Sequence, residues 1–283
     1  MEHQIAVIGG DARAAVLAKL LVQDGHDVVT WGVDGENAPN PVLLDDAVCA
    51  GRIILPVPLA RKDGYLNAAS PLALRELFAR FVAKQKLYGG AIDNDTRELS
   101  RTYGLQITDY FTDEALAVSN AVPTAEGAIA VAMEALPVTI HRTDCLVIGF
   151  GRIGKLLAHR LHALGANVTV SARKRTDFAW ADAFCYRAID TRDLRGKLGG
   201  FRVIFNTVPQ AVLPDECLAE LRGDCVLIEL ASRPGFSLAA AQARGLYAVR
   251  AGGLPGKAAH ETAARAIRDT LYAIGAVERE CVS

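Results

Sequence analysis

A glycine-rich segment in the middle of the chain has the residue spacing of a dinucleotide-binding turn. In "VIGFGRIGK", residues 147–155, three glycines form the pattern G-x-G-x-x-G directly after an apolar, strand-like run and at the start of a helix-like one. The first glycine permits a tight turn, the second lets a pyrophosphate approach the backbone, and the third lets the helix pack closely on the strand. The free N–H groups and the dipole of the helix start then favour an anion. The expected cofactor contacts in this segment are Gly149, Gly151, Arg152, Ile153 and Gly154.

The end of the following predicted strand indicates which dinucleotide is bound. In "VTVSARKR", residues 168–175, Ser171 stands where a site that prefers NAD usually carries Asp or Glu, about 20 residues beyond the glycine turn. Arg173, Lys174 and Arg175 follow it, and such cations suit the 2′-phosphate of NADP. We therefore expect NADP, with NAD as the less favoured cofactor, and contacts from Ser171, Arg173 and Lys174. The alternative is that the basic residues form a solvated surface loop.

Three further polar or glycine-rich loops follow predicted strands. They read "NTVP" (206–209), "ELASRPG" (229–235) and "GGLPGK" (252–257). Because open α/β sheets bind ligands at the carboxyl ends of their strands, these loops predict a cleft for cofactor and substrate. The first loop is expected on the nicotinamide side, with cofactor contacts from Asn206, Thr207, Val208 and Pro209.

Apolar segments of strand length alternate with amphipathic segments of helix length, which predicts an α/β fold with parallel sheets covered by helices. The expected strands are 5–8, 28–31, 52–55, 87–91, 145–148, 168–171, 203–206, 226–229 and 247–250. The expected helices are 12–24, 71–84, 95–103, 124–136, 152–164 and 258–274.

An internal repeat predicts two domains built on the same βαβ unit. "IAVIGGDARAAVLAKLLVQDGHDVVTW" aligns without a gap on "CLVIGFGRIGKLLAHRLHALGANVTVS", so that Gly9 falls on Gly149. The first copy has Asp11 and Ala14 where the second has its other two glycines. A carboxylate at that turn would repel a diphosphate, so the N-terminal copy is expected to bind substrate or a partner. The alternative is an ordinary turn in which Asp11 caps the helix.

Composition excludes several classes of protein. The chain has 283 residues and a net charge of -1, with no long basic run, which argues against nucleic acid as the main partner. No apolar run approaches the roughly 20 residues of a membrane span, and no signal-peptide pattern begins the chain, so a cytoplasmic protein is expected. Its six cysteines form no C-x-x-C pair, which favours buried thiols over disulfides and predicts no metal site.

A set of motifs spread along essentially the whole chain resembles one family. "AVIGGDAR", "ILPV", "NAVPTAEGAI", "VIGFGRIGK", "SAR", "NTVP", "LASRPG" and "GLPGKAAHETA" occur in this order. Together they look like the dipicolinate synthase A-subunit family of spore-forming bacteria. The resemblance implies the last step of dipicolinate formation, a branch from lysine biosynthesis during sporulation, with NADP and a flavoprotein-like B subunit. The last motif departs from the family pattern at His260, Glu261 and Ala264, so no role is carried over to these three.

The implied reaction restricts the roles of the remaining polar residues. Aromatising a dihydropyridine dicarboxylate removes a hydride and a proton and leaves two carboxylates to be held; the hydroxylated precursor must lose water as well. Arg233 is the first candidate to hold one, because a guanidinium matches a carboxylate in shape and charge; alternatively it pairs with a neighbouring acid. Lys257 is the second catalytic candidate, with a solvated side chain as its alternative. The candidates for substrate binding are Asp11, Arg13, Thr124, Glu126, Ser232 and Arg233, although Thr124 and Glu126 also fit an ordinary helix start.

The expected layout is that of formate and glycerate dehydrogenases. Residues 1–120 are expected to form a flavodoxin-like or partial Rossmann domain for substrate or interaction, 121–137 a connecting helix, 138–256 a Rossmann domain for the dinucleotide, and 257–283 a helix that packs back toward the first domain. An oligomer is expected. Two other functions fit the same fold: a 2-hydroxy-acid dehydrogenase, disfavoured because "LPGK" offers no histidine at the strand end, and a sensor protein that binds NADP without doing chemistry.

Overall fold

The computed structural model describes residues 3–35 and 37–278, which fold into two compact units. The first unit contains Met1–Asn120 and Ala259–Ser283, and the second contains Ala121–Ala258. The C-terminal helix is therefore part of the first unit. Each unit is built on its own parallel sheet, as the alternating pattern predicted.

The first unit has a five-stranded parallel sheet in the order β2-β1-β3-β4-β5, the flavodoxin-like order. Its strands are β1 (Ile5–Ile8), β2 (Val28–Trp31), β3 (Arg52–Ile54), β4 (Lys86–Gly89) and β5 (Ile107–Asp109). Its helices are α1 (Ala12–Gln23), α2 (Leu44–Ala47), α3 (Leu74–Phe78), α4 (Asn94–Thr102), the 3-10 helix η1 (Tyr110–Thr112) and α11 (His260–Ala273).

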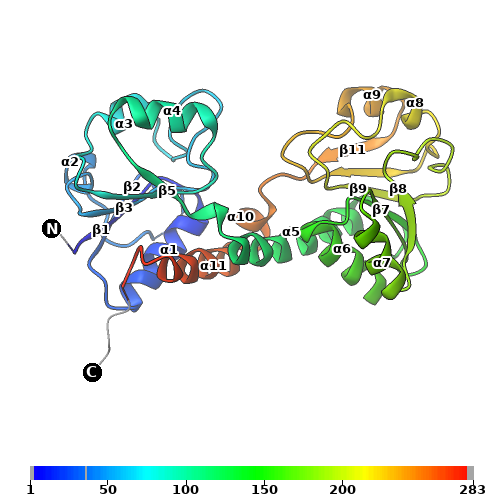
Figure 1. The fold of residues 1–283 in the computed structure, drawn as a ribbon, viewed down its shortest axis with the longest axis horizontal. Helices are drawn as coiled ribbons and strands as arrows, with labels where there is room; N and C mark the ends of the chain where they lie inside the picture. The colour runs from blue at the N-terminus through cyan, green and yellow to red at the C-terminus, as the bar shows by residue number, and fades with distance from the viewer. Residues whose placement is uncertain (1–2, 36, 279–283) are drawn as a thin grey trace. The chain divides into compact units, whose positions relative to one another are not determined.

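The strands of this sheet are apolar on both sides because helices cover both faces. Along β1, Ile5 and Val7 pack with the buried residues of α1 and α11, whereas Ala6 and Ile8 pack on the opposite face. Figure 1 shows α11, in red, lying beside α1, in blue, and these two helices share the largest helix interface of the unit.

The second unit has a six-stranded parallel sheet in the order β11-β10-β9-β6-β7-β8, the strand order of a Rossmann fold. Its strands are β6 (Asp144–Ile148), β7 (Asn167–Ala172), β8 (Arg187–Asp190), β9 (Val203–Asn206), β10 (Val226–Glu229) and β11 (Tyr247–Arg250). Its helices are α6 (Arg152–Ala163), α7 (Arg175–Ala183), α8 (Asp215–Leu218), α9 (Leu238–Ala243) and α10 (Leu254–Ala258), together with most of α5 (Glu114–Ala135).

Alternate residues of these strands also face two separate cores. Val147, Phe205 and Ile228 pack with α5, α6 and α7, while Ile148 and Leu227 pack with α8 and α9. The ribbon shows α6 and α7 on one side of the sheet and α8 and α9 on the other (Figure 1). Since both faces are covered, the loops at the strand ends are the parts of the sheet left to meet a ligand.

Helix α5 differs from its predicted bounds. It begins at Glu114, because Asp113 caps it: the Asp113 carboxylate accepts a hydrogen bond from Leu116 N at 2.9 Å. Pro123 therefore lies inside the helix instead of starting it. The longer helix is, by length and composition, the one helix in the described part of the chain that could span a membrane, a test that core helices also pass. In the most apolar 18-residue window of this helix, 44% of the window is buried within the fold.

Other elements differ for reasons of tertiary structure. The predicted helix 71–84 is wrong: only Leu74–Phe78 is helical, since Ala73 bridges Tyr65 in an antiparallel pair and the side chain of Gln85 donates to Val48 O and Ala50 O. The strands β5 and β8 were missed, being short and polar at their ends. "LPGK" starts α10 instead of forming a loop, and the last helix starts at His260.

Removal of the Leu271 side chain should destabilise the first unit. Leu271 on α11 is fully buried with the residues of α1, so Leu271→Ala leaves a cavity and is expected to lower the free energy of unfolding by about 2–5 kcal/mol. The measurement is chemical denaturation followed by circular dichroism. Ile274→Ala, at a position 38% exposed just after the same helix, is the control. Equal losses for both variants would contradict the placement of α11 in this core.

Candidate dinucleotide and substrate site

The glycine turn of the second unit has the geometry that a pyrophosphate requires. Gly149 follows β6 with a φ of +95°, and a Cβ on Gly154 would collide with the carbonyl oxygen of Gly149. By contrast, a Cβ on Gly151 would meet no atom within 4 Å, and Gly151 begins α6 without a side-chain cap. The turn therefore combines tight packing behind it with open space in front of an uncapped helix start, where Arg152 and Ile153 are the first two helical residues.

The loop after β9 closes against this turn. Thr207 lies beside Gly149 and donates both its backbone N–H and its hydroxyl to Ile148 O, each at 2.9 Å. A side chain on Gly149 would collide with the Thr207 hydroxyl. The structure thus brings the "NTVP" loop and the glycine turn together, with Val208 half-buried and Pro209 exposed at its edge.

A buried carboxylate joins this loop to the next one. Glu229, at the end of β10, is fully buried and accepts hydrogen bonds from Asn206 Nδ2 at 2.8 and 3.0 Å. It also accepts from the backbone N–H of Ala231 at 2.8 Å and of Gly235 at 2.7 Å. Burial raises the pKa of Glu229, although these hydrogen bonds act in the opposite direction. Sequence reasoning did not single out Glu229; an acid at the end of an otherwise apolar strand was the available signal.

The "ASRPG" loop presents Arg233 to solvent. Arg233 is exposed, and among the described residues it forms no hydrogen bond or ion pair. The expected alternative, pairing with a neighbouring acid, does not occur there. Ser232 is exposed too, and its carbonyl oxygen accepts from Arg250 Nη2 at 2.6 Å. The guanidinium of Arg233 is therefore available to an anion, while the loop that carries it is tied down on both sides.

The basic residues after β7 are also available. Arg173, Lys174 and Arg175 are exposed, and Arg173 contacts the side chain of Gln210 at 3.5 Å. Ser171 differs: it is fully buried, and its hydroxyl lies 3.0 Å from that of Thr191. The strand ends one residue later, at buried Ala172, so no acidic side chain stands at its end.

The predicted site residues on α5 and α10 lie outside the glycine turn and the loops after β9 and β10. Glu126 forms an ion pair with Arg160 of α6 at 3.1 Å, and Thr124 is half-buried on α5. Lys257 is exposed on α10, which packs on α5 at Gly127, where an added Cβ would lie 3.1 Å from Leu254. No group of three or more His, Cys, Asp or Glu in residues 3–35 and 37–278 is placed to hold a metal.

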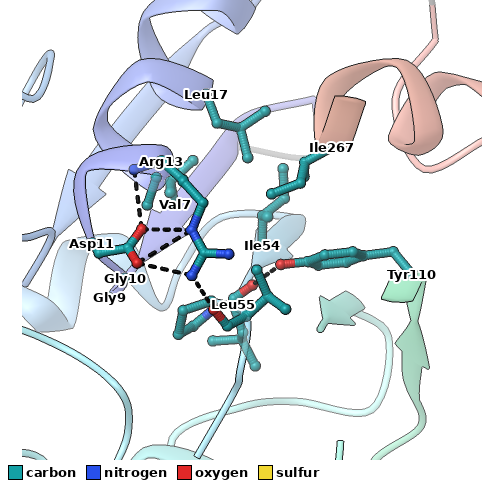
Figure 2. A pocket seen from close by; sticks show the side chains of 13 residues that line it. Val7, Gly9, Gly10, Asp11, Arg13, Leu17, Ile54, Leu55, Tyr110 and Ile267 are labelled. Atoms are coloured by element: carbon teal, nitrogen blue, oxygen red, sulfur yellow. Dashed lines mark hydrogen bonds and ion pairs between the residues drawn. The ribbon is translucent and has the colours of Figure 1, made fainter. Parts of the chain in front are cut away.

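In the equivalent turn of the first unit, the acidic residue forms hydrogen bonds and an ion pair within the turn. Asp11 caps α1 and is paired with Arg13 through Nε at 2.9 Å and Nη2 at 2.8 Å, and the same Nη2 donates to Val57 O (Figure 2). Burial raises the pKa of Asp11, but the hydrogen bonds and charge of Arg13 outweigh it, so the pKa lies below its usual value. Arg13 is 8% exposed, and the cavity beside it measures about 20 Å³, the size of about one water molecule. A cavity of this size cannot hold a dinucleotide.

Comparison with known proteins identifies the relatives of this chain. Residues 4–111 match the family model for the N-terminal domain of the dipicolinate synthase A-subunit. The dipicolinate synthase A-subunit of Bacillus subtilis (strain 168) is 28% identical over 279 residues, which cover 95% of this chain and 94% of that protein. The chain is a relative of the dipicolinate synthase A-subunit.

Solved structures agree with this relationship. The dipicolinate synthase A-subunit from Bacillus halodurans superposes with a TM-score of 0.87 and 26% identity, covering 97% of this chain and 98% of that one. D-Lactate dehydrogenase from Escherichia coli has a TM-score of 0.63 at 13% identity over 98% of each chain, which shows a shared fold alone. The fold of this chain is therefore an oxidoreductase-like α/β fold, as predicted.

Gly154→Ala should damage the glycine turn. The added Cβ must displace either α6 or the carbonyl of Gly149, so we expect the free energy of unfolding to fall by about 1–3 kcal/mol and the binding of a nicotinamide dinucleotide to weaken. Denaturation and fluorescence titration measure the two effects. Gly223→Ala, whose Cβ meets open space, is the matched control. A Gly154→Ala variant as stable as this control would contradict the described packing.

Proposed function

We propose that this chain is the A-subunit of dipicolinate synthase, an enzyme that uses NADP to aromatise dihydrodipicolinate, or its hydroxylated precursor, to dipicolinate. The similarity to the Bacillus subtilis protein over 95% of the chain supports this proposal. The oxidoreductase-like fold supports the reaction class. NADP is the proposed cofactor, with NAD less favoured.

One observation carries the proposal: at the carboxyl ends of its strands, the sheet of the second unit has an uncapped glycine turn, exposed cations after β7 and an exposed Arg233. The glycine turn suits a pyrophosphate, and Arg173 with Lys174 suits a 2′-phosphate. Because Ser171 is buried against Thr191, the preference for NADP rests on the two cations and on the missing acid at the end of β7.

The residues of this site would bind and orient the reactants. When bound, the nicotinamide of NADP supplies a hydride acceptor. Thr207, Val208 and Pro209 would line its side of the site, and Arg233 would hold a substrate carboxylate through its planar guanidinium. Asn206, also predicted to contact the cofactor, is fully buried and its amide is bonded to Glu229 and Val208, so its proposed role is to support this loop. Lys257 is proposed as a second cation for the substrate. Removal of a hydride and a proton makes the ring aromatic, so orientation of the dicarboxylate is the main task left to the protein.

The remaining substrate contacts stay predictions. They are Asp11, Arg13, Thr124, Glu126 and Ser232. For Arg13, such a contact has to be made beside the existing pair with Asp11.

We further propose a hetero-oligomer with a flavoprotein-like B subunit, in the cytoplasm of the mother cell of a sporulating bacterium. The relatives are named as one of the subunits of an enzyme, which supports the presence of a second one. A small dicarboxylate, and neither nucleic acid nor a membrane, is the proposed ligand class.

The deciding experiment is dipicolinate production, followed by its ultraviolet absorbance. The purified chain is supplied with freshly generated dihydrodipicolinate or the hydroxylated precursor, with NADP or NAD, and with or without the flavoprotein-like partner. We expect product with NADP. Bound NADP without product in any mixture would favour a sensor protein, and reduction of NADP by a 2-hydroxy acid would favour a hydroxy-acid dehydrogenase.

The basic residues after β7 should discriminate between the two dinucleotides. Arg173→Ala combined with Lys174→Ala removes two exposed cations, so NADP binding is expected to weaken by about 10-fold or more while NAD binding changes little. Calorimetric titration of both dinucleotides measures the difference. Arg187→Ala, an exposed arginine of the same unit on β8, is the control. Equal losses for NADP and NAD would show that the two cations are ordinary surface residues.

A further inference from the structure

The carboxylate of Glu229 has more hydrogen-bond partners than a surface acid, and none of these donors is a cation. Its two oxygens accept from two backbone N–H groups and one side-chain amide, and its exposure is 0%. A buried charge is costly unless hydrogen bonds compensate it, and the raised pKa of Glu229 reflects that cost. Both oxygens of this buried carboxylate are nevertheless satisfied, so it fixes the positions of the groups that donate to it.

The two backbone donors lie on either side of Arg233. Ala231 N–H binds Oε1 and Gly235 N–H binds Oε2, so Glu229 holds the chain two residues before and two residues after Arg233. The loop from Ala231 to Gly235, here called the bridge, is therefore held at both ends by the Glu229 carboxylate. Arg250 adds a third anchor by donating to Ser232 O at 2.6 Å.

The same carboxylate sets the position of this bridge relative to the neighbouring loop. Asn206 donates to both oxygens of Glu229, and its own side chain closes a turn with Val208, donating to Val208 O at 3.0 Å and accepting from Val208 N at 3.1 Å. Gly235 O in turn accepts from Val212 N at 2.8 Å and Leu213 N at 3.0 Å. A side chain on Gly235 would collide with Asn206 Nδ2, so the two loops touch with no spare space.

We propose that Glu229 is a positioning residue of the reaction: it holds Arg233 at a fixed place relative to the Asn206–Pro209 loop, and so relative to the hydride acceptor. This inference rests on the proposed function, in which Arg233 binds a substrate carboxylate. Glu229 itself touches neither substrate nor cofactor and acts through the loop that carries Arg233.

The carboxylate form is required because both oxygens face donors. In Glu229→Gln one oxygen becomes an NH₂ group, which would face the N–H of either Ala231 or Gly235 instead of accepting from it. One end of the bridge is then released. Arg233 keeps its chemistry but loses its fixed position.

A double-mutant cycle tests this inference. Glu229→Gln, Arg233→Ala and the double variant are compared for binding of dipicolinate to the NADP-loaded protein by calorimetry, and for turnover. We expect each single variant to weaken dipicolinate binding and lower turnover by about 10-fold or more, with the NADP dissociation constant within about 3-fold of the parent value. The double variant should bind dipicolinate and turn over as well as Arg233→Ala does, because Glu229 acts only through the Arg233 side chain, which is already absent. Glu216→Gln, an exposed acid of the same unit, is the control.

Three results would overturn the inference, and they are distinguishable. Losses that multiply in the double variant would show that Glu229 stabilises the unit without acting through Arg233. Unchanged dipicolinate binding in Glu229→Gln, with Arg233→Ala impaired, would remove only the positioning role. Unchanged dipicolinate binding in Arg233→Ala would show that Arg233 does not bind a substrate carboxylate, and the proposed function of Arg233 would then fail.

A conservative variant keeps the test decisive if Glu229→Gln melts below the assay temperature. Glu229→Asp retains the charge and both acceptors with a shorter reach, so the unit should stay folded while the bridge shifts. We expect its dipicolinate affinity to lie between those of the parent and Arg233→Ala, with NADP affinity retained. Parent-like dipicolinate affinity and turnover in a folded Glu229→Asp variant would contradict the inference.

Discussion

The burial of both faces of two parallel sheets is the constraint from which the other features of this protein follow. A parallel sheet needs crossover helices, and these helices cover its faces, so the strands become apolar on both sides. In the second unit, Val147 and Ile148 are neighbours in one strand and face two different cores. Polar chemistry is then confined to the ends of the strands, which is where the glycine turn, the "NTVP" loop and Arg233 occur.

Confinement to strand ends leaves a second problem, because loops at a sheet edge are inherently mobile and a reaction needs fixed groups. Here hydrogen bonds that start from buried atoms supply the rigidity. Thr207 ties its loop to the end of β6, and Glu229 ties that loop to the next one through Asn206. The exposed side chain of Arg233 stands on this scaffold and is left available for an anion, and exposed Lys174 follows β7 at the same end of the sheet.

The internal repeat shows how one βαβ unit serves two purposes. Both copies have a glycine with positive φ after the first strand, at Gly9 and Gly149. In the second copy the helix begins at Gly151 without a side-chain cap, and a Cβ on this glycine would meet no atom within 4 Å. In the first copy the Asp11 carboxylate accepts from the backbone N–H of Arg13 and forms an ion pair with the Arg13 side chain. At the equivalent turn, Asp11 and Ala14 stand where the second copy has Gly151 and Gly154, and the Asp11–Arg13 pair occupies the helix start.

The amino-acid sequence by itself determined the fold class, the two βαβ units, most strand positions and the residues of the glycine turn. These depend on local patterns: apolar runs, glycine spacing and the charge of short segments. Tertiary structure decided the rest. Helix α5 starts after Asp113 because of a cap, 71–84 is mostly not helical because Gln85 and Ala73 have distant partners, and Ser171 is buried by its contact with Thr191. The role of Glu229 was hidden for the same reason, since its donors come from two loops that meet only in the folded sheet.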